Sequence, residues 1–261
     1  MRRGILTVDV EDNFTCEELV NKDDWPKYES QVVDNTLRIL ALLKSNNARA
    51  TFFIVGKVAE RHPELIKYIC QDEHEIASHS YWHKPLNLIS PREIEEDIRM
   101  SRDILSSLTG TPILGYRSMG YSIPDDEKGF YTLLKEYGYA YSSSRKPEKK
   151  NNVQTIMNGN IFQIYPSVIN LFGSKLVFSG GTYFRILPIY VINKGCSVYQ
   201  RLGQPIMIYV HPWEFNNDQP KRKVPLMQKM LQSPITFTTE RKLTYLLQRY
   251  NFTSIKEYIG L

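Results

Sequence analysis

The sequence predicts an α/β fold built on a parallel sheet, and three observations indicate this. Strand-like apolar segments alternate with segments that carry apolar residues at helical spacing, from residue 5 to residue 77. Acidic, histidine and arginine side chains directly follow four of the strand-like segments, and α/β folds place their chemistry at the carboxyl ends of parallel strands. The 261 residues are 42% apolar and show no internal repeat or long linker, so we expect one domain over residues 1–261.

The first half of the chain contains the clearest elements. Short apolar segments rich in β-branched and aromatic residues predict strands, and apolar residues at positions 3 and 4 apart predict helices. We expect strands at residues 5–10, 48–56 and 75–77 and helices at residues 29–45 and 64–70.

The second half begins with a helix over residues 91–108, for which Ser90 is the expected N-cap. A strand at residues 113–117 ends in Arg117, and a buried arginine needs a carboxylate or a substrate anion beside it. The remaining expected elements are a helix at 125–137, strands at 140–142 and 206–210, a loop at 143–152, short strands and turns from 153 to 199 with a turn at 158–159, and a closing helix at 238–248.

The composition gives no support to a nucleic-acid-binding, disulfide-bonded or membrane-spanning protein. The net charge of +5 comes mostly from scattered residues, and the basic runs at 145–150 and 221–223 are too short for a nucleic-acid-binding surface. Three cysteines share no motif spacing, so we expect reduced thiols. No apolar run approaches the roughly 18 residues of a membrane span, and the N-terminus passes directly into a strand, unlike a signal peptide. These features predict a cytoplasmic location.

Three acids lie in four residues at the end of the first strand. Asp9 and Glu11 share one face because side chains alternate along a strand, whereas Asp12 opens the following loop. Carboxylates this close repel one another unless a cation lies among them. Either Glu11 or Asp12 could complete a metal site.

A histidine pair follows the third expected strand. His79 and His83 are four residues apart, so one helical turn would direct both imidazoles at a single point. Together with the acids of the first strand, this spacing predicts a metal site.

Five further segments occur in the order of the motif blocks of one family. They are Ala50-Thr51-Phe52-Phe53, His74-Glu75-Ile76-Ala77-Ser78-His79 with His83, Gly115-Tyr116-Arg117, Gly181-Thr182-Tyr183-Phe184-Arg185 and His211-Pro212-Trp213-Glu214. In this respect the chain resembles the NodB-type polysaccharide deacetylases, carbohydrate esterase family 4. The opening Asp9-Val10-Glu11-Asp12 is similar to the branch associated with bacterial and archaeal surface-polysaccharide gene clusters.

The resemblance implies a distorted (β/α) barrel of about seven parallel strands and a metal-dependent deacetylase that removes N-acetyl groups from a sugar or glycan intermediate. By this likeness Asp9 is the catalytic base, Arg117 orients it, and His211 is the general acid. A divalent metal, most often Zn²⁺ in such sites, would be held by His79 and His83 with Glu11 or Asp12. The same likeness places Gly120, Tyr183, Arg185 and Trp213 at the substrate, although a packing role suits Tyr183 equally well and Trp213 nearly as well.

Two departures from the family pattern are visible. The proline expected soon after Arg117 is missing from Ser118-Met119-Gly120, and the aspartate expected before paired serines is replaced by Tyr141. Two alternative functions remain open: hydrolysis of a C–N bond in a small amide or ureide, as in allantoinase-like relatives of the fold, and carbohydrate binding without catalysis.

Overall fold

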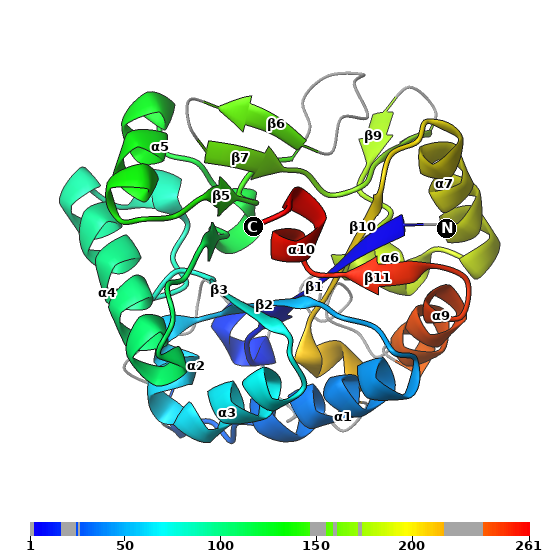
Figure 1. Cartoon of the computed structure of the whole chain (residues 1–261), viewed down its shortest axis with the longest axis horizontal. Coiled ribbons are helices and arrows are strands. Elements are labelled where there is room, and N and C mark those ends of the chain that lie inside the picture. Colours follow the sequence, from blue (N-terminus) through cyan, green and yellow to red (C-terminus); the bar gives the residue numbers. More distant parts are fainter. Residues whose placement is uncertain are drawn as a thin grey trace.

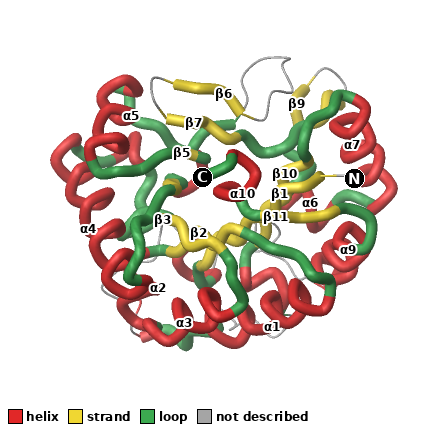
Figure 2. Tube along the Cα trace, in the orientation of Figure 1, coloured by secondary structure: helices red, strands yellow, loops and turns green. Residues whose placement is uncertain are grey.

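A computed structural model describes residues 3–16, 25, 27–146, 155–158, 161–171, 174–216 and 237–261. Its strands curl into a partial barrel at the centre, and helices form an outer layer around most of the circumference (Figure 1; Figure 2). This is the distorted (β/α) barrel that the sequence predicted. The prediction of one domain, by contrast, stays a prediction.

Seven strands run parallel in the spatial order β10-β1-β2-β3-β4-β5-β7, which confirms the expected number. They are β1 (Arg3–Val10), β2 (Thr51–Ile54), β3 (Glu75–Ser78), β4 (Gly115–Tyr116), β5 (Tyr141–Ser142), β7 (Ile161–Ile164) and β10 (Ile206–Val210). β6 (Thr155–Asn158) pairs antiparallel with β7, and β11 (Asn251–Thr253) pairs with the start of β1. β8 (Ile169–Leu171) and β9 (Ser174–Leu176) form a separate antiparallel pair.

Helices follow the strands along the chain, singly or in pairs. They are α1 (Val32–Ser45), α2 (Gly56–Arg61), α3 (Pro63–Gln71), α4 (Pro91–Thr109), α5 (Glu127–Glu136), α6 (Gly181–Ile186), α7 (Ile189–Arg201), α9 (Phe237–Leu247) and α10 (Ile255–Ile259). The described 3-10 helices η1 (Asn13–Cys16), η3 (Leu86–Leu88), η4 (Met119–Tyr121) and η5 (Pro212–Phe215) lie between them. The predicted N-cap of α4 is present as a capping box, in which Ser90 and Glu93 exchange side-chain and backbone hydrogen bonds.

One prediction for the second half of the chain was wrong. Short strands and turns were expected from residue 153 to residue 199, but α6 and α7 occupy its last part. Ile192, Cys196 and Tyr199 are buried at helical spacing along α7, while Gly195 lowers its helix propensity. A Cβ atom at Gly195 would lie 2.8 Å from the Phe178 ring, so close packing against that ring explains the glycine.

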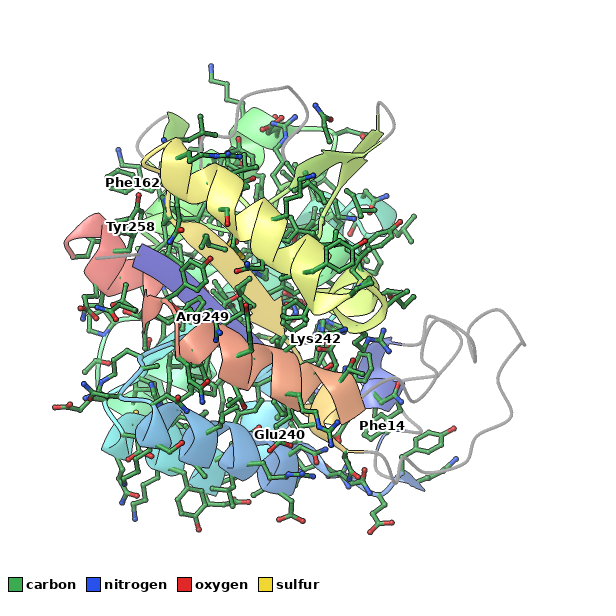
Figure 3. The ribbon with its side chains drawn as sticks, turned by 90° about the vertical axis from the view of Figure 1, so that its right-hand side faces the viewer. Phe14, Phe162, Glu240, Lys242, Arg249 and Tyr258 are labelled. Carbon is green, nitrogen blue, oxygen red and sulfur yellow. The ribbon has the colours of Figure 1, made fainter. Side chains whose placement is uncertain are left out.

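The interior of the barrel changes from apolar at one end to charged at the other. Along β1, Leu6 and Val8 pack with the helices, whereas Ile5, Thr7 and Asp9 point inward. The C-terminal helix α10 fills the apolar end, where Ile5 and Ile255 belong to one cluster (Figure 1). In Figure 3, Phe162 and Tyr258 lie together at that end and Phe14 lies at the opposite end.

No sheet hydrogen bonds join β7 to β10 among the described residues, and two polar contacts bridge this gap. Ser167 accepts a hydrogen bond from the Met207 backbone N–H at 2.9 Å, and its carbonyl accepts one from the Ser179 hydroxyl at 2.9 Å. Gly180 then forms an isolated bridge with Tyr209 of β10. Residues 167 and 179–180 therefore complete the wall of the barrel.

Several sequence predictions fall on residues outside the described ranges. These are the basic run at 221–223, most of the run at 145–150 and of the loop at 143–152, the second residue of the turn at 158–159, and the side chain of Cys16. Cys70 and Cys196 carry free thiols. No helix in the described part of the chain is long and apolar enough to cross a membrane, and the cytoplasmic location stays a prediction.

Candidate active site

The register of the parallel strands brings the predicted site residues to one level. Val10, Ile54, Ser78, Tyr116 and Ser142 pair in series across five neighbouring strands. The residues that directly follow three of these strands are His79, Arg117 and Ser143. Because parallel strands end at one edge of a sheet, these side chains meet at the carboxyl end of the barrel.

Asp9 and Arg117 form a buried ion pair. The Arg117 Nη1 atom lies 2.6 Å from Asp9 Oδ1 and also donates a hydrogen bond of 2.9 Å to Thr7. Arg117 Nη2 donates to the Ser143 hydroxyl at 2.9 Å, and the guanidinium carbon lies 4.0 Å from the centre of the Phe53 ring. Ser143 belongs to the serine run that lacks the family aspartate, so a neutral acceptor holds the arginine from this side.

The prediction of a helical turn between His79 and His83 was wrong, although the two side chains do lie together. The segment that carries them is an irregular loop in which Ser80 and His83 have φ angles of 67° and 52°. Asp97 of α4 holds the loop by accepting the backbone N–H groups of Tyr81 at 2.9 Å and Trp82 at 2.8 Å. The His79 and His83 ring centres are 4.8 Å apart as a result.

Both imidazoles present Nε2 to the same space. His79 Nδ1 lies 2.9 Å from the Arg117 carbonyl oxygen, and His83 Nδ1 lies 3.0 Å from that of Thr15. Since a carbonyl oxygen only accepts hydrogen bonds, Nδ1 carries a proton in each ring, and Nε2 is the atom that each ring directs at the cluster. Burial is the largest influence on His79 and lowers its pKa to about 4, which favours the neutral, ligating form.

Glu11 completes a cluster of metal-binding atoms with the two histidines. One ligand atom from each of Glu11, His79 and His83 lies within 4.8 Å of the others, and all three side chains are buried. Burial raises the pKa of Glu11, but the charge and hydrogen bond of His83, whose Nε2 is 2.7 Å from Glu11 Oε2, outweigh it and lower the pKa. One carboxylate and two imidazole nitrogens are a donor set that fits a divalent metal with open positions.

Asp12, the other acid considered as a ligand, has different partners. Its carboxylate accepts hydrogen bonds from the Ser30 hydroxyl at 2.5 Å and from the Gln31 backbone N–H at 2.9 Å. Gln31 directly precedes α1, so Asp12 holds the start of this helix.

His211 lies on the other side of Asp9 and Glu11. Its Nε2 atom is 3.9 Å from Asp9 Oδ2 and 3.7 Å from Glu11 Oε1, while Nδ1 is 3.0 Å from Glu214 Oε1. Burial lowers the pKa of His211, but the Glu214 carboxylate outweighs this effect and the pKa rises to about 9. The ring is therefore cationic at neutral pH and can donate a proton from Nε2.

Two of the predicted substrate residues surround His211 and Glu214. The Trp213 ring is 7% exposed and stacks on the His211 ring, with centroids 5.3 Å apart. Arg185 Nε lies 3.5 Å from Glu214 Oε1, and its guanidinium lies 4.8 Å from the Trp213 ring. Lys242 of α9 donates to the carbonyl of Arg185 at 2.6 Å and so holds the end of α6 (Figure 3).

The other two predicted substrate residues lie elsewhere around the site. Tyr183 is 48% exposed on α6, and Gly120 has a φ angle of 60° within η4. Contact of Gly120, Tyr183, Arg185 and Trp213 with a substrate stays a prediction.

Sequence reasoning gave no role to Glu214 or Tyr121. The i,i+3 spacing of His211 and Glu214 was a usable signal, because one turn of 3-10 helix places such residues on the same face. Tyr121 has no comparable signal. Its backbone is left-handed with a φ angle of 60°, its ring lies 5.6 Å from the Arg117 guanidinium, and its buried hydroxyl has no hydrogen-bond partner among the described residues.

Comparison with family models gives two adjoining matches. Residues 21–142 match the model of the polysaccharide deacetylase family. Residues 133–260 match the model of a domain of unknown function, DUF3473. The first match contains the histidine loop and Arg117, and the second contains His211.

Several curated relatives with similar segments are deacetylases. Two peptidoglycan-N-acetylglucosamine deacetylases of Bacillus cereus are 36% identical over 95 residues and 32% identical over 114 residues. These matches cover 36% and 44% of this chain and 33% and 48% of the relatives. A chitooligosaccharide deacetylase of Bradyrhizobium is 32% identical over 60 residues, which is 23% of this chain and 27% of that protein. The chain thus spans half or less of the curated relatives it matches.

Solved structures share the fold at low sequence identity. A family 4 carbohydrate esterase from Streptomyces lividans, solved with acetate, has a TM-score of 0.52 at 16% identity and covers 97% of this chain and 91% of its own. A pseudoenzyme of the same family from Bacillus anthracis has a TM-score of 0.57 at 16% identity and covers 98% of this chain and 64% of its own. The chain is thus similar to the polysaccharide deacetylase family over residues 21–142, and it shares its fold with a solved family 4 carbohydrate esterase.

Proposed function

We propose that this protein is a metal-dependent hydrolase that removes N-acetyl groups from an acetylated sugar or glycan. The observation that carries the proposal is the convergence of three units at one end of the barrel. They are the Asp9–Arg117 pair, the cluster of Glu11, His79 and His83, and the His211–Glu214 pair.

Glu11, His79 and His83 would hold the metal, and a set of one carboxylate and two imidazoles suits Zn²⁺ best. A divalent metal in such a site supplies a Lewis acid that activates water and polarises an acyl carbonyl. The hydrogen bonds from both Nδ1 atoms to backbone carbonyls support this assignment, because they fix the orientation of the ligating rings.

The remaining residues supply the proton transfers of amide hydrolysis. Arg117 holds the Asp9 carboxylate in place through their ion pair, and Asp9 would accept a proton from the attacking water. His211, held as a cation by Glu214, donates a proton to the nitrogen of the departing amine when the C–N bond breaks. Water and the acetamide are thereby converted to acetate and a free amino sugar.

The first motif, Asp9-Val10-Glu11-Asp12, favours a glycan intermediate of surface-polysaccharide synthesis, linked to a lipid or a nucleotide, as the substrate. Two alternatives follow from the same site. A small amide or ureide could replace the acetamide as the substrate. Alternatively, the protein could bind a carbohydrate without catalysis, and a protein of similar fold from Bacillus anthracis is described as a pseudoenzyme. The presence here of Asp9, Arg117 and His211 together with the metal cluster favours catalysis over binding alone.

Acetate release from a panel of N-acetylated sugars, oligosaccharides and small amides tests the proposal. Chelated protein, zinc-restored protein and the Asp9→Asn variant would be assayed together. We expect release that needs metal and is lost in Asp9→Asn. Turnover of small amides alone would favour the ureide hydrolase, and zinc binding without any turnover would favour the binding protein.

A further inference from the structure

The turn between α6 and α7 exposes apolar side chains at alternate positions. Ile186 is 54% exposed and Tyr190 is 71% exposed, and Pro188 between them is also exposed. Leu187 and Ile189, which alternate with them, pack against the hydrophobic core. One set of apolar side chains therefore anchors this turn on the core while the other set faces solvent.

Tyr183 extends the exposed set. It lies three residues before Ile186 in α6, so the two side chains are neighbours on the surface of that helix. We call the exposed set the apolar corner, which consists of Tyr183, Ile186, Pro188 and Tyr190. Single exposed apolar residues are common on proteins, but a group of them that includes aromatic rings marks a surface that contacts a protein or a membrane.

The apolar corner lies toward the same end of the barrel as the candidate active site. Helix α7 ends shortly before β10 begins, so its last residues lie at the amino end of the sheet and its first residues toward the carboxyl end. Arg185 of α6 accordingly lies 3.5 Å from Glu214, the partner of His211. In Figure 3, α7 (yellow) and α9 (orange) lie on the face toward the viewer. A partner on the corner would therefore lie beside the residues of the site.

The elements that carry the apolar corner hold positive charge and no negative charge. The sequence contains no aspartate or glutamate between Glu148 and Glu214, and the Glu214 side chain is buried. Lys194 is exposed and follows Tyr190 by four residues, on the same face of α7. The corner therefore has a cation beside its most exposed aromatic ring.

Helix α9, which contacts α6, adds a second cation to this side of the barrel. Arg241 is exposed in α9, and the preceding Glu240 is already paired with Arg38 at 3.1 Å. Neither Lys194 nor Arg241 forms an ion pair with another described residue. Both are thus available to an anionic surface.

We propose that the apolar corner binds the surface of a lipid bilayer with anionic headgroups. Tyrosine suits the boundary between water and hydrocarbon because its ring is apolar and its hydroxyl is polar. Apolar side chains that enter this boundary bind more tightly when neighbouring cations meet anionic lipids. Such contact holds the bilayer next to the active site, which makes a lipid-linked glycan the preferred substrate. The choice of substrate rests on the proposed function, whereas the membrane contact does not.

The charge favours a bilayer over a second copy of the chain. A symmetric dimer through this corner would bring two identical cationic surfaces together. Like charges across an interface repel each other, whereas an anionic bilayer attracts both cations.

Sedimentation of the full chain with vesicles tests this inference without any glycan. Vesicles of phosphatidylcholine alone are compared with vesicles of phosphatidylcholine and phosphatidylglycerol in equal parts. Each lysine or arginine near an anionic surface strengthens binding roughly fivefold, so we expect the protein to bind the anionic vesicles at least tenfold more tightly. The difference should shrink at high salt, because salt screens exposed charges.

The double variant Ile186→Ser with Tyr190→Ser removes the apolar contact and should weaken binding to the anionic vesicles at least tenfold. Each single variant takes its place if the double variant does not fold. Lys194→Gln should weaken binding to the anionic vesicles roughly fivefold and leave binding to neutral vesicles unchanged. Leu202→Ser is the matched control, because Leu202 is 52% exposed just beyond the opposite end of α7, and its binding should equal that of the wild type.

Three results would overturn the inference: no binding to either kind of vesicle, equal binding to both kinds, or undiminished binding of the double variant. A dimer in light scattering that the double variant dissociates, without vesicle binding by the wild type, would instead make the corner an interface between two copies.

Acetate release from water-soluble acetylated sugars is measured separately, so the two proposals can fail independently. Vesicle binding that needs the apolar corner, with no acetate release from any substrate, would sustain the membrane contact and refute the deacetylase. Acetate release without vesicle binding would do the reverse.

Discussion

Arg117 and Asp9 are joined by a hydrogen bond of 2.6 Å in the interior of the barrel, 108 positions apart in the chain. Removal of the cation in Arg117→Met leaves the Asp9 carboxylate buried without its partner, which typically costs about 3–5 kcal/mol. We expect a loss of unfolding free energy of this size, measured by denaturant unfolding of the metal-free protein.

The double variant Arg117→Met with Asp9→Asn separates charge from packing. It removes both charges, so it should recover a large part of the stability lost in Arg117→Met. If the losses of unfolding free energy in the two single variants simply add in the double variant, Asp9 and Arg117 are not energetically coupled.

The choice between Glu11 and Asp12 as the third ligand can be tested by metal binding. Glu11→Gln should weaken zinc binding by more than the roughly 10–100-fold that changes behind a ligand cost, because Glu11 lies in the cluster with His79 and His83. Asp12→Asn should leave zinc affinity within a factor of about ten and instead lower the unfolding free energy by about 1 kcal/mol, because Asp12 holds the start of α1. Competition with a chromophoric chelator measures both affinities, and the reverse ranking would assign the ligand to Asp12.

Patterns among neighbouring residues in the sequence predicted those features of the site that depend on neighbouring residues alone. The alternation of side chains along β1 placed Asp9 and Glu11 on one face, as found. The alternation could not separate Glu11 from Asp12, because the residues that bind Asp12 follow it by 18 and 19 positions. A contact of that range depends on where the loop and α1 return to the strand.

The histidine loop and α7 show the same limit. His79 and His83 converge because Asp97, on a helix later in the chain, holds the backbone between them, whereas their spacing alone suggested a helical turn. Gly195 disfavours a helix in sequence, but the close approach of Phe178 requires it. Strand order and barrel closure likewise rest on contacts such as Ser167 with Met207, 40 positions apart.

Glu214 should control the protonation of His211. Glutamine at this position keeps the hydrogen-bond acceptor but removes the charge, so burial should dominate and lower the pKa of His211 from about 9 by about 1 to 3 units. NMR titration of the imidazole in metal-free Glu214→Gln measures this change. Arg185→Gln removes the cation 3.5 Å from the same carboxylate and should leave the pKa of His211 unchanged or higher. A fall in both variants would contradict the proposed role of Glu214.

Loss of the Tyr121 hydroxyl should stabilise the protein. This buried oxygen has no hydrogen-bond partner in the described part of the chain, and an unsatisfied buried polar group costs about 1–3 kcal/mol. Tyr121→Phe keeps the ring against Tyr209, so we expect the unfolding free energy to rise by about 1 kcal/mol. Tyr139→Phe is the matched control, because the buried Tyr139 hydroxyl donates to the Ile98 carbonyl, and its removal should destabilise the protein. A loss of stability in both variants would mean that the Tyr121 hydroxyl has a partner in solution.

His74 should make stability depend on pH in the acidic range. Its ring packs 5.1 Å from the Phe52 ring, both ring nitrogens lack hydrogen-bond partners among the described residues, and burial lowers its pKa to about 4. The unfolded chain takes up a proton near the ordinary value of about 6.5, while the folded protein does so only near pH 4. Stability contributed by the neutral ring is therefore complete above pH 6.5 and falls by up to about 3 kcal/mol as the pH drops to 4.

The variant His74→Phe keeps the aromatic packing and removes the titration. Its unfolding free energy should decrease less than that of the wild type between pH 6.5 and pH 4, and the difference between the two proteins isolates His74 from the buried histidines of the metal cluster. Urea unfolding at half-unit pH intervals measures both curves. Parallel curves would show that the His74 ring is protonated at the same pH in the folded and unfolded protein, and thus that its nitrogens reach water.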